Sequence, residues 1–276
     1  DVGSVNKLPY EYKYSDLVLN LKNKVVLPGF VSYHTHLSLF PLRFMGLGLT
    51  LREWEETVAW PYETTLTPEE SFYASKLAIY TFIKNEKNIR IHVHASETLD
   101  DVRKVREIFN KRPVEVLKDY GLLSENTIIA HAVWVTEREI DYIAKSGANV
   151  AHCPVSNNIL LSGNMPLIDM FSKNVKVGLG TDINPSWNVM SEARLAYHTV
   201  NTLYGVPSRI TPYTLLKMAT GNYAKFKGIE NHGKIAKGYD ANIIVLDFAE
   251  VKGWPNIFNI YEAILFSEAS VETVIV

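Results

Sequence analysis

Residues 127–152 read TIIAHAVWVTEREIDYIAKSGANVAH and contain one complete strand–helix–strand unit. The apolar, β-branched run Thr127–His131 is typical of a buried strand. Thr136 is followed three residues later by Glu139, a capping box that predicts the start of a helix. The apolar run Asn149–His152 predicts the next strand. A strand, a helix and a second strand in this order indicate a βαβ unit of a parallel sheet.

The same unit recurs along the chain, and each predicted strand ends in a histidine or an aspartate. These ends are His94, His131, His152 and Asp182, at intervals of 37, 21 and 30 residues. Each interval fits one strand and one helix with their loops. Polar residues at the carboxyl ends of successive parallel strands build the site of a TIM-type (β/α)8 barrel. The sequence therefore predicts an α/β fold of this type.

The first part of the chain adds a barrel strand. Residues 30–36 are an apolar run ending in His34-Thr-His36 and predict a buried strand. Residues 37–66 are rich in aromatic side chains and are expected to form a loop. Residues 100–120 are helical in pattern.

The two chain ends are expected to form a second unit. A turn followed by an apolar run at Gly233–Asp247 predicts a strand that pairs with strands near the N-terminus. We therefore expect a small β-sandwich domain made of residues 1–28 and 230–276. The barrel is expected to occupy residues 29–229.

The spacing in the first half of the chain is too short for a complete barrel. Only 52 residues separate His36 from Ile89, and a loop and a helix take up part of them. A βαβ unit takes about 30 residues or more, so three further strands do not fit there. A barrel closes only with all its strands. We predict that a segment of the native chain is missing between Lys84 and Asn85.

Composition and charge exclude several classes of protein. Of 276 residues, 47% are hydrophobic and 21% are charged, which is typical of a globular protein. The formal charge of −2 argues against a nucleic-acid partner, and no apolar run approaches the roughly 20 residues of a membrane helix. The single cysteine, Cys153, excludes an internal disulfide and indicates a cytoplasmic location. Because Asp1 is not an initiator methionine, the lack of a visible leader sequence is weak evidence about the location of the protein.

His34 and His36 are placed to share a metal ion. Residues i and i+2 of a strand project from the same face, about 7 Å apart. His94 and Asp182 end other strands of the same sheet. Three imidazoles and one carboxylate suit a single divalent ion, zinc first and iron as the alternative, with a position open for water.

Other residues near these strand ends have several interpretations. His92 shares a strand face with His94, and spacing alone does not choose the ligand between them. His131 and His152 could each be a ligand, a polarising group or a structural histidine. Glu97 lies just past the strand that ends at His94, where a carboxyl group could relay protons.

A bound metal ion would give this cluster a hydrolytic chemistry. The ion lowers the pKa of a bound water and produces hydroxide near neutral pH. Asp182 would accept the proton of that water, and His131 could stabilise the hydroxide or the oxyanion. Glu97 could protonate a ring nitrogen or the leaving group.

Several motifs resemble the amidohydrolase superfamily. Leu27-Pro-Gly-Phe-Val-Ser-Tyr-His-Thr-His36 is similar to its P-G-h-h-x-x-H-x-H signature, and Gly180-Thr-Asp182 matches its final ligand motif. Further segments resemble the branch that holds S-adenosylhomocysteine and methylthioadenosine deaminases and triazine chlorohydrolases. These segments are Leu49-Thr-Leu-Arg-Glu-Trp54, His92-Val-His-Ala-Ser-Glu-Thr98, Ala130-His131 and His152-Cys-Pro-Val-Ser-Asn157.

The resemblance implies a mononuclear hydrolytic site. By motif position it selects His94 as the ligand rather than His92, and it implies that Glu97 and His131 flank the water while Asp182 acts as base. The implied metal ligands are His34, His36, His94 and Asp182.

The resemblance also implies residues that contact the substrate. It places Trp54 over the substrate ring and His152 behind the metal site or against the substrate. Ser186, four residues after Asp182, would face the substrate. Ile183 stands where the family has a glycine, and this difference bears on the shape of the pocket.

The preferred function is a metal-dependent hydrolase that deaminates an adenine-type nucleoside or a related nitrogen heterocycle by attack of metal-bound hydroxide. The alternatives are chlorohydrolase or aminohydrolase activity on triazines, guanine or cytosine, and a non-catalytic barrel that serves as a scaffold. The expected partners are a small heterocyclic substrate and, from the resemblance, further copies of the chain in a homo-oligomer.

Overall fold

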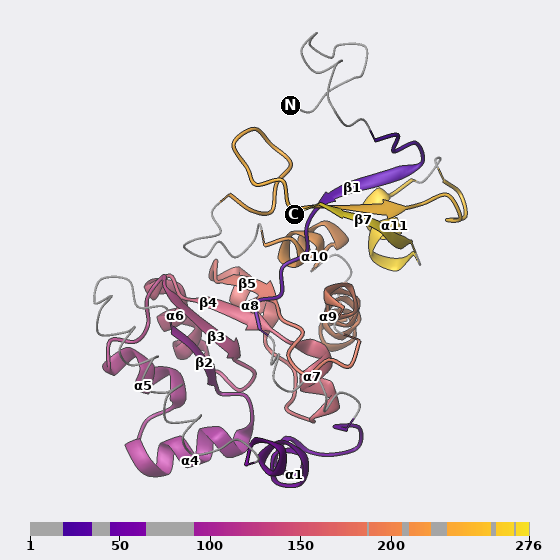
Figure 1. Cartoon of the computed structure of the whole chain (residues 1–276). Helices are drawn as coiled ribbons and strands as arrows, with labels where there is room; N and C mark the ends of the chain where they lie inside the picture. The colour runs from indigo at the N-terminus through magenta and orange to yellow at the C-terminus, as the bar shows by residue number, and fades with distance from the viewer. Residues whose placement is uncertain are drawn as a thin grey trace.

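Two sheets organise the part of the chain that the structure describes (Figure 1). The structure is a computed structural model, and it describes residues 19–34, 45–64, 91–186, 188–205, 210–221, 231–254, 258–267 and 269–275. His36, the helix expected between the loop at residues 37–66 and Ile89, and the Lys84–Asn85 junction lie outside these residues.

The larger sheet is parallel, and its strand order is β2-β3-β4-β5. The register places His94 beside Ala130 and His152 beside Leu179. This sheet fits part of a (β/α)8 barrel, as predicted. Its strands are β2 (Ile91–Ala95), β3 (Thr127–His131), β4 (Asn149–His152) and β5 (Lys176–Leu179).

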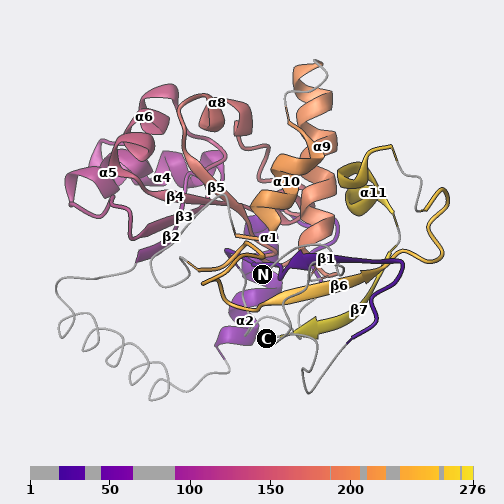
Figure 2. The same ribbon diagram turned by 90° about the horizontal axis from the view of Figure 1, so that it is seen from above.

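Helices follow each strand and cover the sheet. Figures 1 and 2 show α4, α5 and α6 along the outer side of β2, β3 and β4. The expected capping box is present at α6, where the Thr136 side chain accepts the backbone N–H of Glu139. The helices are α4 (Leu99–Phe109), α5 (Pro113–Asp119), α6 (Glu137–Ser146), α7 (Pro154–Ile159), α8 (Leu167–Ser172), α9 (Val189–Tyr204) and α10 (Pro212–Ala219).

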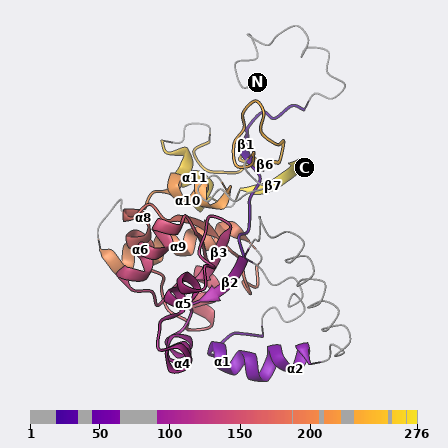
Figure 3. The same ribbon diagram turned by 90° about the vertical axis from the view of Figure 1, so that its left-hand side faces the viewer.

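Residues 100–120 are helical, as expected, and form two helices, because Asn110 turns into the left-handed region at a φ of 52° and Pro113 begins the second helix. The expectation of a loop over residues 37–66 is wrong for part of that segment. Residues 51–63 are helical, although the whole of residues 37–66 was expected to be a loop. They form α1 (Leu51–Trp54), a π-helical turn η4 (Glu55–Ala59) and α2 (Trp60–Glu63), and α1 lies beside α4 (Figures 1 and 3).

The start of α1 explains why the loop prediction failed. Thr50 accepts the backbone N–H of Glu53, and the Glu53 carboxylate accepts the backbone N–H of Thr50, which completes a capping box. The aromatic residues around this signal obscured it. Of these aromatic residues, Trp54 is buried in a small apolar cluster with Leu160, whereas Trp60 is exposed.

The smaller sheet joins the two halves of the sequence. Its order is β1-β6-β7, all antiparallel, with β1 (Lys24–Pro28), β6 (Ile243–Asp247) and β7 (Ser270–Ile275), and α11 (Ile260–Phe266) lies next to it (Figure 1). Within the described ranges it is a single sheet. A β-sandwich and the domain boundaries near residues 28 and 230 therefore stay predictions.

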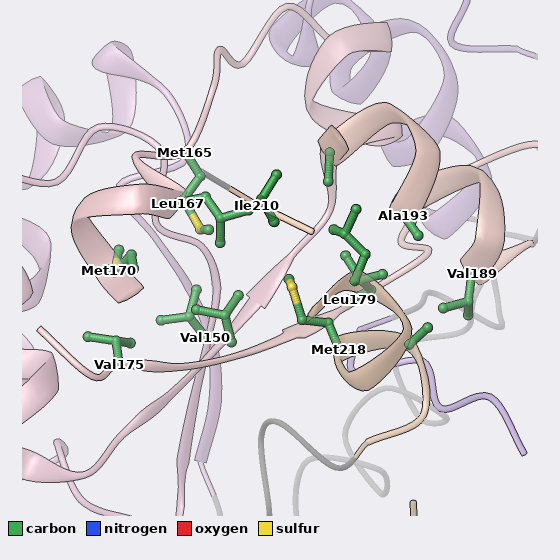
Figure 4. Packing of buried hydrophobic residues seen from close by; sticks show 14 of the residues in the cluster. Val150, Met165, Leu167, Met170, Val175, Leu179, Val189, Ala193, Ile210 and Met218 are labelled. Atoms are coloured by element: carbon green, nitrogen blue, oxygen red, sulfur yellow. The ribbon is translucent and has the colours of Figure 1, made fainter. Parts of the chain in front are cut away.

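One hydrophobic core connects the two sheets. Val150 and Leu179 of the parallel sheet pack with Leu167 of α8 and Met218 of α10 (Figure 4). Phe248, directly after β6, is fully buried in the same cluster. The small sheet is therefore attached to the barrel strands by continuous apolar packing.

The segment that ends at His34 lies directly against β5. The N–H of Tyr33 donates to the carbonyl of Leu179 at 2.8 Å, and the N–H of Asp182 donates to the carbonyl of His34 at 2.8 Å. Two glycines leave room for this contact. A Cβ atom at Gly178 would lie 2.2 Å from the Tyr33 ring, and one at Gly180 would lie 2.8 Å from the Cβ of His34.

We expect Gly178→Ala to destabilise the protein, because its methyl group would overlap the Tyr33 ring. Overpacking of this kind costs about 1–3 kcal/mol of unfolding free energy. Gly29→Ala is the matched control, because a Cβ there would lie 3.4 Å from its nearest neighbour, an ordinary contact. Urea unfolding of the two variants measures the difference, and equal stability would contradict the close packing.

Candidate active site

The strand ends bring three histidines and one aspartate together. The Nε2 atom of His34 lies 3.1 Å from Nε2 of His94 and 3.3 Å from Oδ1 of Asp182. One ring nitrogen each of His34, His94 and His131 lies within 4.8 Å of the others. The side chains of His34, His131 and Asp182 are buried, whereas His94 is exposed.

The backbone bends sharply where these side chains leave their strands. Ser96, His131 and Asp182 have φ values of 56°, 70° and 46°, in the left-handed region. An L-residue there costs roughly 1–2 kcal/mol. Such strain persists only where the surrounding structure enforces it, and it is concentrated at functional sites. Here this backbone strain occurs at the ends of three strands of one sheet.

The donor atoms fit a divalent metal ion. Imidazole nitrogens and a carboxylate are ligands that zinc and iron accept. A second group of potential ligands consists of His131, Cys153 and Asp182. Burial raises the pKa of the Cys153 thiol well above its usual value, and nearby carboxylates raise it further. The thiol therefore stays protonated, and the nitrogen and oxygen atoms are the better donors.

The structure places the predicted ligands as follows. His34, His94 and Asp182 lie together, His131 lies within reach of the same point, and His36 is outside the described residues. The Nδ1 atom of His34 lies 2.9 Å from Nε2 of His92. His92 is therefore behind His34, an arrangement that favours His94 as the ligand.

Glu97 adds a second carboxyl group to this cluster. Its carboxyl group is buried, with Oε2 at 3.4 Å from Nε2 of His131. Burial raises the pKa of Glu97 to about 8, and the negative charge of Asp182 adds to the effect. The Ser162 hydroxyl donates to Oε1 at 3.1 Å and acts in the opposite direction. In the protein alone, Glu97 therefore holds a proton at neutral pH.

His131 and Asp182 each have a partner on α7. Nδ1 of His131 lies 2.8 Å from the amide oxygen of Asn157, so this nitrogen donates and Nε2 faces the carboxyl groups. The Ser156 hydroxyl donates to Oδ2 of Asp182 at 2.5 Å. Ser156 and Asn157 belong to a motif visible in the sequence, but no spacing signal indicated that α7 would direct them at two strand ends.

A pocket of about 460 Å³ opens above these groups. Its wall combines apolar side chains from α1, η4, α2 and the loops with polar side chains from α4. Trp54 is part of this wall, and its contact with a substrate stays a prediction. The lining includes Leu51, Trp54, Trp60, Leu160 and Ile183, together with His94, Glu97, His131 and Asp182.

The other predicted substrate residues lie differently. His152 is buried and is not part of this lining; burial lowers its pKa to about 3, so its ring is neutral. Ser186 is exposed, and its hydroxyl donates to Oδ1 of Asn184 at 2.8 Å. Substrate contact by either residue stays a prediction.

Comparison with known proteins agrees with the fold. Residues 62–276 match the family model described as the amidohydrolase family. A 5-methylthioadenosine/S-adenosylhomocysteine deaminase of Pyrococcus abyssi is 28% identical over an alignment that covers 85% of this chain and 76% of the relative.

Solved structures show the same fold. A zinc-bound adenosine deaminase of Xanthomonas campestris superimposes with a TM-score of 0.83 at 19% identity, covering 92% of this chain and 79% of that one. A zinc complex of atrazine chlorohydrolase from Arthrobacter aurescens gives a TM-score of 0.76 at 16% identity, with 92% and 83% covered.

The chain belongs to the amidohydrolase family. It is accordingly a hydrolytic enzyme that acts on carbon–nitrogen bonds. The alignment with the Pyrococcus relative spans 326 positions, more than the 276 residues of this chain, so the relative has residues with no counterpart here. Whether they fall between Lys84 and Asn85 stays a prediction.

In the part of the chain that the structure describes, no helix is long and apolar enough to cross a bilayer. The cytoplasmic location, the homo-oligomer and the absence of a nucleic-acid partner remain predictions from the sequence.

A second buried acid, Glu192 on α9, lies behind the cluster. Its carboxyl oxygens accept the backbone N–H of Val155 at 2.9 Å and the side-chain amide of Asn184 at 2.5 Å. Burial nevertheless raises the pKa of Glu192 to about 8. The folded protein therefore holds a proton here that the unfolded chain releases near pH 4.5.

This difference predicts how the stability depends on pH. Between about pH 4.5 and 8 the native state binds more protons at Glu192 than the unfolded state does, so the free energy of unfolding falls as the pH rises. One such group contributes up to about 1.4 kcal/mol per pH unit. Glu192→Gln should make the profile less steep in urea unfolding of the metal-free protein between pH 5 and 8. Glu97, whose pKa is also raised to about 8, and the histidines contribute to both proteins, so part of the slope remains, and an unchanged slope would contradict the protonation of Glu192.

Proposed function

We propose that this protein is a metal-dependent hydrolase that deaminates an adenine-type nucleoside or a related nitrogen heterocycle. The observation that carries the proposal is a buried Glu97 beside His131 and Asp182 at the floor of a pocket. Burial and the charge of Asp182 raise the pKa of Glu97, which suits the role of an acid. The deaminases among its relatives support the same reaction.

The proposed metal ligands are His34, His36, His94 and Asp182, with His131 within reach of the same point. When bound, a divalent ion supplies a Lewis acid and a water whose pKa lies near neutrality. The nitrogen and oxygen donors of this cluster suit zinc, and iron is the alternative.

Each buried group has a step in the proposed reaction. The Asp182 carboxylate accepts the proton of the attacking water, and His131 stabilises the negative charge on the oxygen. Glu97 donates its proton to the ring nitrogen next to the carbon that carries the amine. The new carbon–oxygen bond forms, and Asp182 passes the proton taken from the water to the amine. The carbon–nitrogen bond then breaks, ammonia leaves, and the second proton of the water returns to Glu97.

The pocket suits a flat heterocycle. Trp54, Leu160 and Ile183 give it an apolar wall, and its volume of about 460 Å³ falls within the usual range of small-molecule sites. Ile183 occupies space next to Trp54, so it narrows the pocket on that side.

An ammonia-release assay tests the substrate class. Zinc-loaded full chain is incubated with adenosine, 5-methylthioadenosine, S-adenosylhomocysteine, guanine, cytosine and an aminotriazine. We expect one adenine nucleoside to react well above the others. Chloride release from a chlorotriazine with no ammonia from any amine would favour the chlorohydrolase, and no turnover with metal bound would favour the scaffold.

We expect Glu97→Gln to lower kcat by about 10²–10⁴-fold, the usual contribution of a general acid. The variant keeps the size of the side chain but has no ionisable proton to donate. Glu107→Gln is the control, because Glu107 is an exposed glutamate on the neighbouring helix α4. Equal activity of Glu97→Gln and the wild type, at equal zinc content, would remove Glu97 from the reaction.

A further inference from the structure

We infer that one short segment, Ser156–Ser162, positions all three proposed reaction groups. It consists of the end of α7 and the loop that follows, and it is described here as the positioning segment. The inference rests on the proposed function, because Glu97, His131 and Asp182 are reaction groups only in that function.

Three side chains of the positioning segment each hold one group. Ser156 donates to Oδ2 of Asp182 at 2.5 Å, Asn157 accepts Nδ1–H of His131 at 2.8 Å, and Ser162 donates to Oε1 of Glu97 at 3.1 Å. All three are buried. Reaction groups that come from three different strand ends are thus held by seven consecutive residues.

A backbone hydrogen bond closes the positioning segment into a turn. The N–H of Ser162 donates to the backbone carbonyl of Asn157 at 2.8 Å, so the partners of Glu97 and His131 are fixed to each other. Leu161 between them adopts a φ of 56°, in the left-handed region. This turn directs Ser162 back toward Glu97 instead of continuing the helix.

Both ends of the positioning segment are anchored. At its start, Glu192 accepts the N–H of Val155 and also the side-chain amide of Asn184, which lies on the loop after Asp182. At its end, the Trp134 indole donates to the carbonyl of Ser162 at 2.6 Å. Gly163 has a φ of 112°, and a Cβ there would lie 3.0 Å from Val133 and 3.1 Å from Trp134. The anchors therefore come from α9, which is bonded to the loop after β5, and from the loop after β3.

This geometry assigns a different task to each partner. Asn157 fixes the tautomer of His131, with the proton on Nδ1 and Nε2 directed at the carboxyl groups. Ser156 uses one carboxylate oxygen of Asp182 and leaves Oδ1 toward His34. Ser162 holds Glu97 at one oxygen and leaves Oε2 toward His131. None of the three needs to touch the substrate.

Positioning residues affect the chemical step more than substrate binding. Misplacement of a reacting group by about 1 Å can cost about 10²-fold in rate. We expect Ser162→Ala and Ser156→Ala each to lower kcat by about 10–100-fold, with a much smaller change in KM. Because the segment is closed by a backbone bond, the double variant should lose less than the product of the two single losses.

Steady-state kinetics of the zinc-loaded full chain on its best substrate test this role. Ser162→Thr keeps the hydroxyl and should recover most of the kcat lost in Ser162→Ala. Ser172→Ala on α8 is the control, because its hydroxyl is exposed and bonds only to the carbonyl of Asp169. Wild-type kcat in Ser162→Ala, or a loss seen only in KM, would overturn the inference while leaving the proposed function intact.

A measurement that does not depend on turnover separates this inference from the proposed function. Nitrogen-15 NMR of the imidazole groups, with His131 assigned from a His131→Gln variant, should show the proton on Nδ1 in the wild type. Asn157→Leu should shift His131 toward the other tautomer. An unchanged tautomer in folded Asn157→Leu would contradict the role of Asn157, whereas a shifted tautomer in a protein that turns over no substrate would contradict only the proposed function.

Discussion

The close contact between the His34 segment and β5 is the constraint on which the site depends. Tyr33 donates to Leu179, and Asp182 donates to the carbonyl of His34, so the distance between these two side chains is set by the backbone. Such an approach requires residues without side chains at Gly178 and Gly180. The two glycines therefore determine whether an imidazole and a carboxylate from opposite ends of the sequence can face the same point.

The strand ends could be predicted from the sequence because the signal is local and repeated. An apolar run that stops at a polar residue indicated β2, β3 and β4 within two residues, and it placed His94, His131 and Asp182 in one cluster. The apolar pattern shows where a strand ends, but it does not show whether the last side chain points into the pocket or away from it. That is why His152 ends β4 as expected yet is not part of the pocket lining.

The partners of the cluster could not be predicted in the same way. Ser162 lies in a loop ten residues after His152, and its contact with Glu97 depends on a left-handed Leu161 and an anchor at Trp134. Neither has a sequence pattern. The helical residues 51–63 were missed for another reason, since a capping box at Thr50 was outweighed by the aromatic composition of the segment.

The position of β2 in the sheet agrees with the unequal burial of the cluster. In a closed barrel every strand is paired on both sides, whereas β2 is an edge strand among the strands that the structure describes. His92 and His94 on β2 are exposed, and every residue of β3 is buried.

The carboxyl groups of the site influence one another's protonation. Asp182 raises the pKa of both Glu97 and Glu192, so three carboxyl groups compete for negative charge in a buried space. The protein alone resolves this competition by protonating two of them. A divalent ion beside Asp182 would oppose the same repulsion and lower the pKa of Glu97 toward neutrality. An acid whose pKa is set by burial on one side and by a cation on the other can both donate and recover a proton near pH 7, as a deaminase requires in each cycle.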